Sequence, residues 1–203
     1  MGGFATHDHM SSVATSDIDI ASRALILIGA EPITSFSSDT TEALVASNLY
    51  EDTVRTALCT SRWRFATNQA QLNQLTATPT GRFDVAHQLP QDMLMLHAVT
   101  IDDQLIEYTI YGNKLFHNVT ATNPVIADYT FRADEVNFPT YFTLAVEYGL
   151  AASFALAFAR DYAMGQMSER KAQQLMQQAK TLDSQQQTTR KLVTSRFITE
   201  RRS

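Results

Sequence analysis

Five histidines and a single cysteine are the side chains of this chain best suited to bind a metal or to act as a nucleophile. His87, His97 and His117 lie in one stretch, and a three-histidine metal site is one interpretation of them. We favour separate packed or surface histidines, because their neighbours are mostly apolar and show no pattern of carboxylates. The cluster His7-Asp8-His9 could also bind a metal, but a loose leader fixes no coordination geometry. The sequence therefore predicts no metal site.

The other candidates for catalysis have simpler structural explanations. Cys59 follows Leu58 in an expected helix and is favoured as an inert, partly buried thiol rather than a nucleophile. Asp102-Asp103 could be a catalytic carboxylate pair, but adjacent acids between two strands are typical of a turn. The sequence contains no glycine-rich phosphate loop and no nucleophile elbow. We therefore predict no catalytic and no cofactor-binding residues, and we do not expect an enzyme. A hydrolase that uses the scattered histidines is the enzymatic alternative.

Trp63 and Phe65 alternate with Arg62 and Arg64, and this pattern has two interpretations. The aromatic rings could stack on the bases of a nucleic acid. We favour a role in the hydrophobic core, because the acidic body of the chain supplies no basic groove for a strand. The predicted core anchors are Trp63, Phe65, Tyr50 and Phe154.

Charge is distributed unevenly along the chain. The formal net charge is −5, yet the last fourteen residues carry five positive charges against the single negative charge of Glu200. The basic residues are Arg190, Lys191, Arg196, Arg201 and Arg202. A basic tail on an acidic body is usually an interaction arm. Phe197 and Ile198 lie within it, which favours a protein partner, and a nucleic-acid-binding module that uses this tail is the alternative.

The segment from Leu144 to Ala159 is almost wholly apolar, with Glu147 inside it. It is shorter than the roughly 20 residues that span a bilayer, so a buried helix is expected and no membrane partner. The first residues lack the charged start and the apolar run of a signal peptide.

Apolar spacing predicts four helices. The first begins at Ser16 or Asp17 and stops at Gly29, and the second covers Thr41 to Ser61. The third covers Tyr141 to Tyr162 and is broken at Met164-Gly165, and the fourth covers Ser168 to Leu182. Because the third is apolar on all sides, it is expected to be central or to lie at a subunit boundary.

Between the second and third helices the pattern changes to short alternating runs. The expected strands are Met93–Thr100, Leu105–Ile110, Lys114–His117 and Val125–Phe131. Asp102-Asp103 marks one turn, and Gly112-Asn113 marks another, with positive φ expected at both Gly112 and Asn113.

These patterns predict an α+β fold: a four-helix core with a β-rich insertion between helices 2 and 3, and an extended C-terminal arm. The expected boundaries are a flexible leader at 1–15, the first half of the helical core at 16–75, the insertion at 76–135, the second half at 136–183 and the arm at 184–203.

Four stretches of the sequence resemble the head-to-tail adaptors of tailed bacteriophages, of the tail tubular protein A type. They are ALILIGAEPITSF at Ala24–Phe36, RTALCTSRWRFAT at Arg55–Thr67, QLPQDMLML at Gln88–Leu96 and FPTYFTLAVEYGLAASFALAFA at Phe138–Ala159. The resemblance covers most of the chain, and it rests on the order and spacing of these stretches.

The resemblance implies a structural subunit of the virion, assembled in the host bacterial cytoplasm. Such adaptors form a ring, usually dodecameric, beneath the portal, and phage DNA passes through its lumen without sequence-specific binding. The β-region, here with Asp102, Asp103, Gly112 and Asn113, is expected to face the next tail component, a nozzle or tail tube protein. The basic arm is expected to dock into the portal protein.

Overall fold

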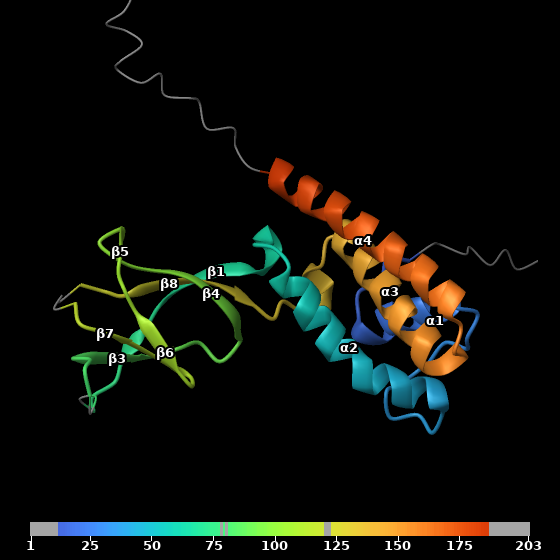
Figure 1. Cartoon of the computed structure of the whole chain (residues 1–203), viewed down its shortest axis with the longest axis horizontal. Helices are drawn as coiled ribbons and strands as arrows, with labels where there is room; N and C mark the ends of the chain where they lie inside the picture. The colour runs from blue at the N-terminus through green and yellow to red at the C-terminus, as the bar shows by residue number, and fades with distance from the viewer. Residues whose placement is uncertain (1–11, 78, 80, 120–122, 187–203) are drawn as a thin grey trace, which may run out of the picture.

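The structure, a computed structural model, describes residues 12–77, 79, 81–119 and 123–186 (Figure 1). The helices gather in one lobe and the strands in another, and the chain crosses between them twice. The leader before residue 12 and the predicted arm from residue 187 onward lie outside the described residues.

The first two helices begin at side-chain caps, and the first of these caps is a residue that the sequence predicts. In α1 (Asp17–Leu27), Ser16 accepts a hydrogen bond from the backbone N–H of Asp19 at 3.1 Å, and the chain leaves the helix through Gly29 at φ +75°. In α2 (Thr41–Cys59), Thr40 accepts from the N–H of Ala43 at 3.2 Å. Ser16 is therefore the N-cap of the first helix.

The predicted third helix ends earlier than expected. It divides into α3 (Thr140–Phe154) and the π-helical turn η3 (Ala155–Ala159). The break comes at Arg160, at φ +52°, rather than at Met164-Gly165, which lies inside α4 (Tyr162–Gln185). A Cβ at Gly165 would lie 3.2 Å from the side chain of Leu156, so glycine lets the start of α4 pack closely on the preceding turn. Among the described residues, no helix is long and apolar enough to cross a membrane.

The expected four-helix core with a β-rich insertion between its second and third helices is wrong. The structure is α+β, with four α-helices and two antiparallel sheets among the described residues. The helical core consists mainly of α3 with α1 and α2 against it, whereas α4 contributes one fully buried apolar side chain, Ala179, and the partly buried Met164 and Met176. A narrow apolar stripe lets α4 cover α3 without completing a bundle. The strands form a lobe with a separate core rather than an insertion into a helical one.

All ladders in the two sheets are antiparallel. The first sheet, in the order β1-β8-β4-β5, consists of Thr67–Gln71, Ile126–Phe131, Met93–Ile101 and Gln104–Leu105. The second, in the order β2-β3-β7-β6, consists of Asn73–Gln74, Val85–Gln88, Lys114–His117 and Thr109–Tyr111. Their shared core includes Val99 and Ala127 from the first sheet and Leu115 from the second. The two sheets therefore bury one face of each against the other.

Strand predictions succeeded where apolar alternation is strong. Lys114–His117 is β7 as expected, and β4 and β8 lie within one residue of the predicted bounds. The run Leu105–Ile110 is not one strand, because it leaves the first sheet after β5 and enters the second as β6. Strands β1, β2 and β3 were not predicted.

The two tight turns differ from the sequence prediction in which residues have a positive φ. Asp102 and Asp103 have φ of 51° and 62°, so the acidic pair takes the left-handed region at both central positions. Gly112 has φ of 59°, but the expectation of positive φ at Asn113 is wrong. Asp102 also accepts a hydrogen bond from Asn123 at 2.6 Å, which helps to hold the turn.

A half-buried ion cluster joins the lobes where the chain returns from β8. The guanidinium of Arg132 bonds Glu51 of α2 at 3.0 Å and Glu135 at 2.5 Å, and Tyr50 donates to Glu135 at 3.0 Å. Burial alone would lower the pKa of Arg132, but its hydrogen bonds to both carboxylates outweigh this and raise it. These bonds fix the end of β8 against α2.

A second cluster lies in the helical lobe, where the chain leaves α2. Asp183, near the end of α4, is buried and accepts hydrogen bonds from the backbone N–H of Arg64 at 3.1 Å and from the hydroxyl of Tyr141 at 3.0 Å. Burial and then Asp183 raise the pKa of Tyr141 to about 12. One carboxylate therefore holds α4 and α3 against residues 64–66, the short turn that leads into β1.

Replacing Arg132 is expected to weaken the joint between the lobes. Arg132→Gln leaves Glu135 without its cation and Glu51 with only the exposed Arg55, and it should lower the free energy of unfolding by about 2 kcal/mol. Chemical denaturation measures this change. Arg55→Gln is the matched control: Arg55 also bonds Glu51, at 2.6 Å, but its side chain is 53% exposed whereas that of Arg132 is 18% exposed. The control should lose less than about 0.5 kcal/mol, and equal losses would contradict the assignment.

Candidate functional site

The residues predicted for portal docking cannot be placed. Arg190, Lys191, Arg196, Phe197, Ile198, Arg201 and Arg202 all lie outside the described residues. The cluster His7-Asp8-His9 also lies outside them.

The four predicted core anchors lie in the helical core. Trp63, Tyr50 and Phe154 are buried, and Phe65 is half-buried against the same core. The indole N–H of Trp63 donates to the carbonyl of Ala57 at 3.0 Å, and its ring meets Phe142 edge-on at 5.1 Å. With its ring enclosed in this way, Trp63 has no free face on which a base could stack.

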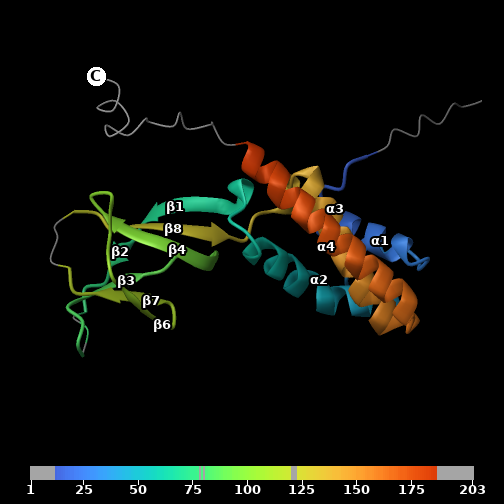
Figure 2. The same cartoon turned by 45° about the horizontal axis from the view of Figure 1, so that its top comes forward.

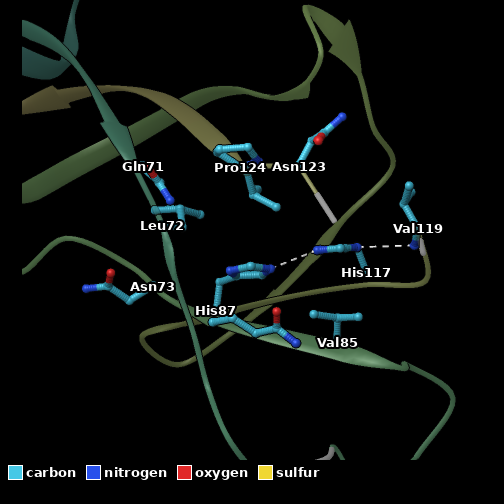
Figure 3. A pocket seen from close by; sticks show the side chains of 11 residues that line it. Gln71, Leu72, Asn73, Val85, His87, His117, Val119, Asn123 and Pro124 are labelled. Carbon is cyan, nitrogen blue, oxygen red and sulfur yellow. Dashed lines mark hydrogen bonds between the residues drawn. The ribbon is translucent and has the colours of Figure 1, made fainter. Parts of the chain in front are cut away.

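The structure brings together two of the three histidines and separates the third. His97 forms a hydrogen bond with the hydroxyl of Thr130 at 2.7 Å. His87 of β3 and His117 of β7 instead face each other in a nearly parallel arrangement, with their Nε2 atoms 3.0 Å apart (Figure 3). Both side chains are almost completely buried. The register pairs Val85 with His117, so the two histidines are diagonal neighbours on one face of the second sheet.

An open cavity of about 590 Å³ lies beside this pair. Its lining is polar and apolar in similar parts and comes from β1, β2, β3, β7 and the segment before β8. The residues labelled in Figure 3 are Gln71, Leu72, Asn73, Val85, His87, His117, Val119, Asn123 and Pro124. The histidine pair therefore lies between the two sheets, at a place that solvent can approach.

The hydrogen bonds around the pair assign its tautomers. The backbone N–H of Val119 donates to Nδ1 of His117 at 3.1 Å, so that nitrogen has no proton in the neutral ring. The proton of His117 then lies on Nε2 and is donated to Nε2 of His87. This leaves the proton of His87 on Nδ1, which has no well-formed hydrogen bond among the described residues.

This arrangement does not suit a metal ion. A ligating Nε2 must be unprotonated, whereas the Val119 contact keeps the proton of His117 on that atom. Among the described residues, no group of three or more histidine, cysteine, aspartate or glutamate side chains is placed to hold a metal. The pair is better described as a buried imidazole chain in which both rings are neutral.

Burial lowers the pKa of both histidines, because a charged imidazolium is poorly solvated there. The backbone of Leu72 opposes this shift at His87, and the neighbouring His87 reinforces it at His117. Protonation of either ring would also put two N–H groups face to face. The sheet lobe therefore favours the neutral pair.

The predicted tail-facing residues divide between two ends of the sheet lobe. The Asp102-Asp103 turn follows β4, at the end where β8 begins, which is the end far from the helices. The Gly112-Asn113 turn precedes β7 and lies at the opposite end of the strands. The structure does not bring these two turns together.

A second, largely apolar groove of about 390 Å³ lies on the helical lobe among α2, α3 and α4. Among its lining residues are Thr53, Ala57, Val146, Gly149, Ala172 and Met176. Cys59 is half-buried at the end of α2 and is not among the residues of this groove.

No protein-family model matches this chain, and no curated protein matches it significantly. The likeness to phage adaptors therefore rests on the four sequence stretches.

Sequence reasoning missed the histidine pair because β3 was not predicted. Once both strands are known, the positions of His87 and His117 in antiparallel register would have placed them on one face. The buried carboxylates of Asp183 and Glu147 gave no signal, since the residues that contact them are far away in the sequence.

The histidine pair should make the stability of the sheet lobe depend on pH. Both folded-state pKa values are below the ordinary value of 6.5, so the unfolded chain binds more protons, and stability falls as pH drops below about 6.5. The loss should reach at most about 1.4 kcal/mol per pH unit for each proton taken up on unfolding. Denaturant unfolding between pH 7.5 and 5.5 measures it above the ordinary titration range of exposed carboxylates. Burial raises the pKa of Glu147, and this buried carboxyl acts on stability in the opposite direction to the histidines.

The double variant His87→Leu, His117→Leu should remove most of this dependence. His97→Gln is the matched control and should retain most of it, because the paired imidazoles remain. An unchanged slope in the double variant would show that the pair is not its source.

Proposed function

We propose that this protein is a structural head-to-tail connector subunit of a tailed phage. In this proposal it forms a ring homo-oligomer, dodecameric by the resemblance, below the portal at the head–tail junction of the virion. Phage DNA passes through the lumen, and tail components assemble on the ring.

The observation that supports this proposal best is the division into two lobes with separate cores and a polar joint at Arg132. A connector must present different surfaces to two partners and keep them at a fixed distance. The cluster around Arg132 ties the end of β8 to α2, and Asp183 holds the turn that leads into β1 against α3 and α4. A binding site that served one small ligand would not need this construction.

The surfaces of the two lobes suit different partners. The helical lobe has the apolar groove among α2, α3 and α4, which offers a protein partner a place to bury side chains. The far end of the sheet lobe has the Asp102-Asp103 turn, which would face the next tail component. The chain is acidic outside its last fourteen residues, which suits a lumen along which DNA must slide without sticking.

Truncation of the arm tests the proposal. Deletion of residues 190–203 should leave the thermal unfolding of the body unchanged and abolish binding to the portal protein of the phage that carries this gene. Phe197→Ala or Ile198→Ala should weaken binding by roughly tenfold or more, since apolar anchors dominate such contacts. Thr199→Ala is the matched control on the same segment. Mass photometry measures portal binding. Unchanged binding by the truncated protein would show that the arm is not the docking element.

The same truncated protein tests the nucleic-acid alternative. A gel shift with duplex DNA at physiological salt, abolished by the deletion and weakened by added salt, would favour that alternative over the connector. Persistence of the full chain as a monomer that does not bind portal would argue against the connector directly.

A further inference from the structure

Among the described residues, one side of the sheet lobe has an outer edge with nothing to prevent pairing with a strand of another chain. Residues 67–74 form β1, the outer strand of the first sheet, and then β2, the outer strand of the second, with Leu72 between them. This single segment, here called the amide edge, therefore borders both sheets.

Alternate residues of the amide edge direct their backbone groups away from the sheets. Leu72 donates to the carbonyl of Val125 at 2.9 Å, and Leu75 donates to that of Ala86 at 2.8 Å. Because ladder bonds alternate along an antiparallel strand, Thr67, Gln69, Gln71 and Gln74 have outward N–H and C=O groups. The N–H of Gln69 accordingly bonds the side chain of its own neighbour Asn68, at 2.9 Å, rather than β8.

The amide edge lacks the usual devices that prevent pairing with another chain. Natural edge strands carry lysine, proline or inward charges, or are covered. From Phe65 to Gly81 the sequence has no charged residue, and residues 67–74 include no proline. Thr67, Gln69, Gln71 and Gln74 are all exposed. Such an edge is suited to adding a strand from a partner.

The opposite side of the same lobe has a second open edge, formed by residues 104–111 and here called the apolar edge. It consists of β5 and β6, which are the last strands of the two sheets at the ends away from β1 and β2. Figure 2 shows β1 and β6 on opposite sides of the lobe. The two-residue turns place the first ladder bonds at Gln104 and Tyr111, so Leu105 and Ile110 have outward backbone groups.

Apolar side chains are exposed along this second edge. Leu105 is 75% exposed, Ile110 39% and Tyr111 57%. Water contact with three large apolar side chains in one segment is unfavourable and is removed when a partner covers them.

We propose that the amide edge of one copy pairs with the apolar edge of the next copy. This inference rests on the proposed function, since it names the contact through which the ring forms. Both edges have outward N–H and C=O groups, so the donors of each edge can bind the acceptors of the other. Self-pairing of the amide edge would leave the apolar edge uncovered, whereas self-pairing of the apolar edge would bring Glu107 near its own copy. A contact between two different surfaces also leaves each copy able to bind on both sides, as a closed ring requires.

Proline substitutions test the backbone contact directly. Gln69→Pro and Ile110→Pro each remove one outward N–H and no ladder bond, and edge strands tolerate proline. The matched controls Gln69→Thr and Ile110→Val keep the N–H. In size-exclusion chromatography with light scattering, the wild-type chain should form rings, and each proline variant should elute at the mass of one chain, 22.6 kDa.

Concentration series quantify these effects. The concentration for half assembly should rise at least about tenfold for each proline variant and stay within about twofold for each control. Thermal melts compare the folding of all four variants. Gln69→Lys and Ile110→Lys, which block an edge by charge and keep the backbone intact, replace any proline variant that fails to fold.

Mixing the two blocked chains identifies the pairing. Gln69→Pro has an intact apolar edge and Ile110→Pro an intact amide edge, so an equimolar mixture should give a pair of twice the mass and no larger species. Dimers of Ile110→Pro alone would overturn the proposal in favour of self-pairing by the amide edge.

Two further outcomes separate this inference from the proposed function. Assembly of both proline variants at wild-type concentrations would overturn the edge contact but not the proposed connector function. The ring would then form through the helical lobe. A wild-type chain that stays monomeric at every concentration, alone and with portal, would overturn both.

Discussion

The bonds of Arg132 are the constraint on which the arrangement of the two lobes depends. A guanidinium that is mostly removed from water needs carboxylates, and here one comes from α2 and the other from the turn after β8. Because Arg132 bonds both carboxylates, the position where β8 ends is fixed relative to the helices. Tyr50 adds a third bond to the same cluster and lies in the helical core, so the cluster also sets the depth at which α2 is buried.

Local sequence patterns predicted the elements whose own residues determine them. The apolar spacing of α2, the capping side chain of Ser16, and the alternation in β7 each depend on neighbours only a few residues away. β1 could not be predicted in this way. Its sequence, TNQAQ, has no apolar alternation, and it is a strand because β8, nearly sixty residues later, supplies its ladder bonds.

The arrangement of the helices was predicted wrongly for a related reason. An apolar stripe on α4 shows that the helix packs on something, but it does not reveal how many helices share the contact. The position of α4 depends on Asp183, whose partners Arg64 and Tyr141 lie 119 and 42 residues away in the sequence. The second core also escaped prediction, because Leu72 and Leu89 lie outside every strand that alternation indicates. The histidine pair was not predicted either, because its prediction requires both the strand β3 and the register of β3 against β7.

Rigid joints and open edges have a combined consequence for the proposed assembly. A strand added to the amide edge takes the twist of the sheet it joins, which fixes the angle between successive sheet lobes. That angle would have no effect on the helical lobes if each could rotate on its own strands. The bonds of Arg132 oppose such rotation where the chain returns from β8, and Asp183 holds the turn before β1 against the helices. In the proposed ring, the orientation set at the sheet edge would thereby be transmitted to the apolar groove on the helices. In the proposed ring, the polar joint therefore determines whether identical edge contacts close into a ring of defined size, because closure requires the same rotation at every subunit.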